Sequence, residues 1–138
     1  MPPPSFAKPV WALIGAYFIA SLAHFAHNAE FIAFYPNMPA WLTREKVYIA
    51  WLAITGVGAA GLVARRAGLP AFGLFLLAVY GAFGLDGLGH YALALCSQHT
   101  FATNLTIWSE AVSGLALMLV SVLLGYRRLR IEMPTRPA

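Results

Sequence analysis

Four long apolar runs divide the chain, and each is bounded by prolines, polar residues or basic residues. A membrane-spanning helix needs about 20 predominantly apolar residues, and the four runs approach or exceed that length. Pro9 and Pro70 stand where the first turn of a helix tolerates proline, and Arg65-Arg66 closes the second run. The pattern predicts four transmembrane helices, at about residues 10–34, 47–64, 70–95 and 104–126.

The composition agrees with this interpretation. Of the 138 residues, 60% are hydrophobic and only 10% are charged, whereas charged residues make up about 25% of a soluble domain. We therefore expect an all-α, integral membrane four-helix bundle that forms a single domain over residues 1–138. Small residues concentrate at Gly56–Gly61, where they allow another helix to approach closely. This face is predicted to pack inside the bundle, and it also offers a surface for a homo-oligomer.

Basic residues predict the orientation in the membrane. With four spans, both termini and the second connection share one side, and that side carries Lys8, Arg65, Arg66, Arg127, Arg128, Arg130 and Arg136, whereas the other side carries Arg44 and Lys46. Lysine and arginine favour the cytoplasmic side. We expect a multi-pass protein with both termini in the cytoplasm, in the inner membrane if the source is bacterial. No basic stripe is interleaved with aromatic residues, so nucleic acid is not an expected partner.

Ionisable residues nevertheless interrupt three of the apolar runs. They are His24, His27 and Glu30 in the first run, Asp86 and His90 in the third, and Glu110 in the fourth. Such groups are costly at membrane depth unless they find partners in the protein interior, so they mark a functional site by default. A rise of 1.5 Å per residue places all six at roughly 5 to 14 Å from the outer helix ends. The sequence therefore predicts one polar site in the outer half of the membrane.

Helical geometry constrains which of these residues can meet. In a regular α-helix, Asp86 and His90 are separated by four residues and share a face. His24, His27 and Glu30 are separated by three residues, so each is rotated by about 60° from the one before. His27 lies at the centre of that arc, and all three side chains cannot bind one ion unless the helix is distorted.

The leading hypothesis is a metal-dependent membrane enzyme or redox protein. Imidazole and carboxylate ligands suit Zn, Fe, Mn or Cu(II), and the single cysteine, Cys96, argues against thiolate chemistry. The predicted metal ligands are His24, His27, Asp86 and His90, and Glu110 or Glu30 would act as a further ligand or as the catalytic acid or base. Access from the membrane would make the substrate a lipid, a quinone or another apolar molecule.

Two other functions and one structural alternative remain open. In a b-type haem protein, a histidine of the first helix and His90 would bind the iron, and Gly84, Gly87 and Gly89 would make room for the porphyrin. Without a metal or haem, the acids and histidines could serve an acid/base isomerase or the proton relay of a transporter subunit. The same residues could instead form a purely structural network, with Asp86 bonded to His90 and Glu110 to His24 or His27.

Overall fold

The computed structural model describes residues 6–132, with side chains placed through Arg130. Three long helices are continuous, namely α1 (Lys8–Glu30), α2 (Arg44–Arg66) and α5 (Phe101–Glu132). The third span is composite, because α3 (Pro70–Ala82) continues through the 3₁₀ segment η2 (Phe83–Gly89) into α4 (His90–Leu93). Two short 3₁₀ turns, η1 (Ile32–Phe34) and η3 (Cys96–Gln98), lie in the connections. The described residues contain no strand, and the predicted all-α four-helix bundle is confirmed.

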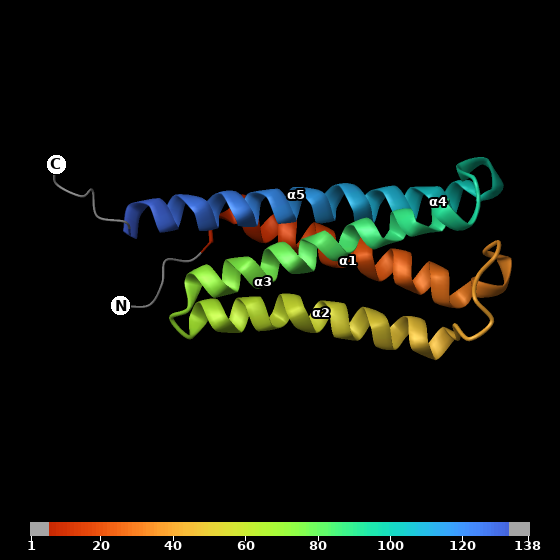
Figure 1. Cartoon of the computed structure of the whole chain (residues 1–138), viewed down its shortest axis with the longest axis horizontal. Helices are drawn as coiled ribbons and strands as arrows, with labels where there is room; N and C mark the ends of the chain where they lie inside the picture. The colour runs from red at the N-terminus through yellow and green to blue at the C-terminus, as the bar shows by residue number, and fades with distance from the viewer. Residues whose placement is uncertain (1–5, 133–138) are drawn as a thin grey trace.

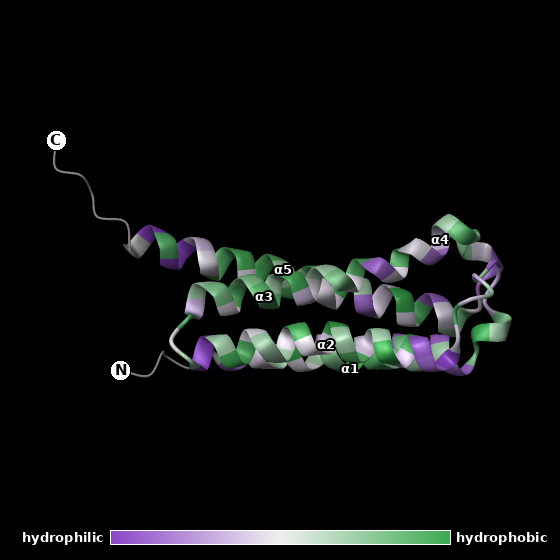
Figure 2. Ribbon diagram, turned by 60° about the horizontal axis from the view of Figure 1, so that its bottom comes forward, coloured by the Kyte–Doolittle hydropathy of each residue, from purple (hydrophilic) through white to green (hydrophobic). Residues whose placement is uncertain are grey.

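The four spans run side by side as one elongated bundle (Figure 1). The start of α1 and the end of α5 lie at one end of the bundle. The connection over residues 31–43 and the connection over residues 94–100 lie together at the other end, which we call the distal end. Hydrophobic residues dominate the middle of the bundle and polar residues gather toward both ends (Figure 2). All four spans are long and apolar enough to cross a membrane, as expected of a multi-pass membrane protein.

Helix ends follow local capping rather than hydropathy alone. The first helix ends at Glu30, four residues before the predicted end, and the chain then tightens into η1. The second helix begins at Arg44, three residues before its predicted start, because the Thr43 side chain caps it by accepting a hydrogen bond from the backbone N–H of Lys46 at 3.4 Å. Charged residues at these ends are therefore part of the helices.

Glycines allow the helices to approach closely. A methyl group built on Gly58 would lie 2.6 Å from the Tyr80 ring, and one built on Gly61 would lie 3.0 Å from the backbone oxygen of Gly73. Gly58 and Gly61 of α2 therefore pack against α3. A methyl group built on Gly56 would have no described atom within 4 Å outside its own stretch of helix. Gly56, Ala59 and Ala60 are exposed, so only part of the face predicted to pack inside the bundle is used within one chain.

The 3₁₀ segment changes which side chains of the third span face inward. A 3₁₀ helix has three residues per turn, so residues three apart lie on one face. The buried residues are Gly84, Gly87 and His90, and the exposed residues are Phe83, Asp86 and Gly89. The prediction that Asp86 and His90 share a face was wrong, because four residues in 3₁₀ geometry turn the chain by roughly 120° beyond a full turn.

Candidate functional site

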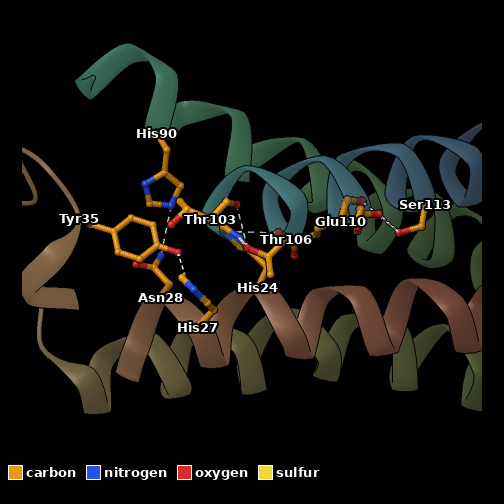
Figure 3. Close-up of polar contacts among 10 residues, drawn as sticks. His24, His27, Asn28, Tyr35, His90, Thr103, Thr106, Glu110 and Ser113 are labelled. Carbon is orange, nitrogen blue, oxygen red and sulfur yellow. Dashed lines mark hydrogen bonds and ion pairs between the residues drawn. The ribbon is translucent and has the colours of Figure 1, made fainter. Parts of the chain in front are cut away.

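A histidine and a glutamate meet in the interior of the bundle, near its distal end. His24 of α1 and Glu110 of α5 are only 2% and 1% exposed, and Nε2 of His24 lies 3.7 Å from Oε2 of Glu110 (Figure 3). Nδ1 of His24 lies 3.4 Å from the hydroxyl of Thr106. Neither carboxylate oxygen of Glu110 has a hydrogen-bond partner among the described residues. Both side chains are almost fully buried, and the imidazole lies close enough to this carboxylate to exchange a proton with it.

Glycine at position 87 makes room for this pair. A methyl group built on Gly87 would lie 3.2 Å from Oε2 of Glu110 and 3.4 Å from Nε2 of His24. The buried glycine face of η2 thus lies directly against Nε2 of His24 and Oε2 of Glu110. Substitution of Gly87 would crowd both side chains.

His90 is held beside this pair by an amide that the sequence analysis did not select. Nδ2 of Asn28 donates to Nε2 of His90 at 3.2 Å, which assigns the His90 proton to Nδ1. The rings of His90 and His24 are 5.4 Å apart between centroids. A sequence signal for Asn28 exists, because it lies four residues after His24 and hence on the same helix face.

Tyr35 lies among three histidines at the distal end. Its hydroxyl is 2.8 Å from Nδ1 of His27, and its ring centroid is 5.0 Å from that of His90 (Figure 3). The ring centroid of His99 lies 6.2 Å from that of Tyr35. Burial raises the pKa of the Tyr35 phenol above its ordinary value, so the hydroxyl stays protonated near neutral pH and shares a hydrogen bond with His27. His27 therefore points toward Tyr35 rather than into the His24–Glu110 pair.

Glu30 lies apart from this cluster. Its carboxylate pairs with Arg44 at 2.8 Å and accepts a hydrogen bond from the hydroxyl of Tyr48 at 2.8 Å. These contacts are exposed and tie the end of α1 to the start of α2. The structure thus gives Glu30 a connecting position and gives Glu110 the position inside the site.

A cavity of about 220 Å³ opens beside His24 and His90. Asp86 lines its rim, is exposed, and has no hydrogen bond or ion pair to the described part of the chain. The remaining wall is mainly apolar and includes Phe25, Met38, Leu42, Val47 and Leu93. Three titratable groups, His24, Asp86 and His90, thus line one largely apolar space.

The predicted metal set does not come together. Within residues 6–132, no three histidine, cysteine, aspartate or glutamate side chains are arranged to hold a metal ion. His24 and His90 are neighbours, but His27 is engaged by Tyr35. The geometry gives no support to the predicted metal site.

The glycines proposed to admit a haem serve helix packing instead. A methyl group on Gly84 would lie 2.8 Å from the Tyr17 ring, and Glu110 and His24 cover Gly87. Gly89 alone of the three has open space beside it. Protein side chains thus fill most of the space that a porphyrin would need, so the fit to a haem is poor.

The chain matches no protein-family model, and no curated protein or solved structure matches it. Its function must be inferred from the chemistry of the site.

Proposed function

We propose that this protein is a membrane-embedded acid/base enzyme that shifts a proton, and with it a double bond, on an apolar substrate. The observation that carries this proposal is the nearly complete burial of His24 and Glu110, 3.7 Å apart, beside a cavity. A positioned acid or base contributes about 10²- to 10⁴-fold to a reaction rate. A buried pair in low dielectric suits this task because no water competes for the proton.

In this proposal, His24, Glu110 and Asp86 have different roles. His24 lines the cavity and exchanges a proton with the substrate, while Glu110 behind it exchanges a proton with His24. A double-bond shift removes a proton at one carbon and adds one at another; His24 can perform both steps, or Asp86, which also lines the cavity, can take one of them. His90, oriented by Asn28, directs an Nδ1–H donor that can hold a polar group of the substrate.

The cavity walls indicate the class of substrate. They are mainly apolar, and the cavity is smaller than the roughly 300–1,000 Å³ of sites that enclose drug-sized ligands. We infer that the reacting segment of a larger lipid enters while the rest stays in the membrane.

Proton transfer to carbon can be detected without knowing the substrate. Purified protein would be incubated in heavy water with a lipid extract of the source organism, and the lipids would be examined by mass spectrometry. We expect at least one lipid to gain deuterium with the native protein and far less with Glu110→Gln. Equal labelling by both proteins, or none by either, would contradict the proposal.

We further propose that the distal end faces away from the cytoplasm, as the distribution of lysine and arginine predicts. Cys96 is exposed at this end and is the chain's single cysteine. A membrane-impermeant maleimide should therefore label Cys96 in intact cells. In a Cys96→Ser, Ala138→Cys variant, labelling should require permeabilised cells. The opposite pattern would reverse the orientation.

A further inference from the structure

A second and larger cavity lies at the distal end, between the end of α1 and the start of α5. Its volume is about 330 Å³, and its aromatic wall consists of Phe31, Phe34 and Tyr35. The Tyr35 ring also contacts His90, which lines the first cavity, so Tyr35 lies between the two spaces. Nothing in the proposed proton transfer uses this second cavity.

The aromatic wall favours a flat ring as ligand. The ring centroids of His27 and Phe31 are 4.8 Å apart, and those of Phe31 and Phe34 are 6.4 Å apart. Phe34 is 81% exposed, so one face of its ring is free. Stacked or edge-on contacts between aromatic rings stabilise a complex beyond the burial of their surface.

The polar atoms of the cavity favour a single neutral hydrogen-bonding group. The hydroxyls of Thr100 and Thr103 bond to each other at 2.9 Å, and Nδ1 of His27 is bonded to Tyr35. Nε2 of His99, in contrast, is buried and has no hydrogen-bond partner among the described residues. Among the residues that the structure describes, no aspartate, glutamate, lysine or arginine lines the cavity. A phosphate or carboxylate headgroup would find no permanent counter-charge there.

We propose that this cavity binds the headgroup of a neutral quinone-type lipid, with one ring oxygen accepting a hydrogen bond from Nε2–H of His99 when the imidazole turns toward the cavity. The ring would pack against Phe31 and Phe34, and its apolar tail would leave the cavity into the membrane. The volume is at the low end for ligand pockets, as expected when only the headgroup is enclosed. This inference concerns binding alone and does not depend on proton transfer at His24.

The test is equilibrium binding of a ubiquinone analogue with a single isoprene unit to the full-length protein in phosphatidylcholine nanodiscs. We expect saturable binding, and His99→Phe and Phe34→Ala should each raise the Kd by roughly three- to tenfold. His99→Gln keeps a hydrogen-bonding group and should retain most of the affinity. Phe101→Ala is the matched control, because Phe101 is also 81% exposed but does not line the cavity.

Two further measurements distinguish binding at this site from non-specific binding and from the proposed catalysis. Dodecanol, which has an apolar chain and a hydroxyl but no ring, should displace the quinone poorly. Glu110→Gln should bind the quinone like the native protein, so failure of the catalytic proposal leaves this result unaffected. Size exclusion would check that His99→Phe and Phe34→Ala are folded. The inference is overturned if the native protein does not bind the quinone or if dodecanol competes equally well. It is also overturned if His99→Phe and Phe34→Ala bind the quinone as tightly as the Phe101→Ala control.

Discussion

Glu110→Gln should lower the rate of deuterium transfer to the substrate by about 10²- to 10⁴-fold. Glutamine keeps the size of the buried side chain but cannot accept a proton from His24, so the bundle should fold while the proton exchange between α1 and α5 is lost. The measurement is the initial rate of deuterium incorporation, combined with size exclusion and circular dichroism on the same sample.

Glu30→Gln provides the matched control for this variant. It makes the same chemical change in another glutamate near the distal end, where the carboxylate is exposed and bonded to Arg44 and Tyr48. Exposed ion pairs contribute at most about 1 kcal/mol to stability, so both rate and folding should stay close to native. A Glu30→Gln protein as slow as Glu110→Gln would show that the wrong acid has been assigned to catalysis.

Gly81→Ala should produce a large loss of stability in the bundle. A methyl group at this position would lie 2.6 Å from the backbone oxygen of Gly114 and 2.6 Å from the backbone nitrogen of Met118. Neither atom can move without shifting α5, so we expect a cost at or above the upper part of the roughly 1–3 kcal/mol range for overpacked cores. Unfolding in mixed detergent and denaturant measures this change.

Gly56→Ala is the corresponding control in α2. No atom lies within 4 Å of the added methyl group, and alanine favours helix by about 1 kcal/mol over glycine. This variant should be as stable as the native protein or slightly more stable. If both substitutions had the same effect, the close contact of α3 with α5 would not hold in the membrane.

The architecture was predictable because a membrane demands long, apolar helices that satisfy their own backbone hydrogen bonds. Run length therefore gave the number of spans. The helix ends were less accurate because residues such as Thr43 and Arg44 belong to caps and first turns that hydropathy assigns to loops. Hydropathy did not predict which helices contact each other, although the small residues of α2 indicated its packing face.

The candidate site was predicted in part. Depth in the membrane indicated six residues, and the structure brings three of them, His24, His90 and Glu110, close together. The position of Asp86 was mistaken because a regular α-helix was assumed through a segment that is 3₁₀. The closely spaced Gly84, Gly87 and Gly89 were a signal that this helix is irregular.

The parts that were missed came from outside the spans or carried no charge. Tyr35 and His99 lie in the two connections of the distal end, and only the folded chain brings their rings within 6.2 Å. Asn28 is uncharged, so the search for ionisable residues did not include it. Its place on the buried stripe of α1 with Ser21 and His24 would have identified it.

Whether His24 and Glu110 titrate as one unit can be measured directly. Solid-state NMR of isotope-labelled histidine in lipid bilayers would follow the protonation of His24 with pH in the native protein and in Glu110→Gln. Two buried groups 3.7 Å apart should interact by at least about one pH unit, so the midpoint of the His24 transition should change by that amount or more when Glu110 is replaced. An unchanged midpoint would show that the two residues do not share a proton and would contradict their role as a catalytic pair.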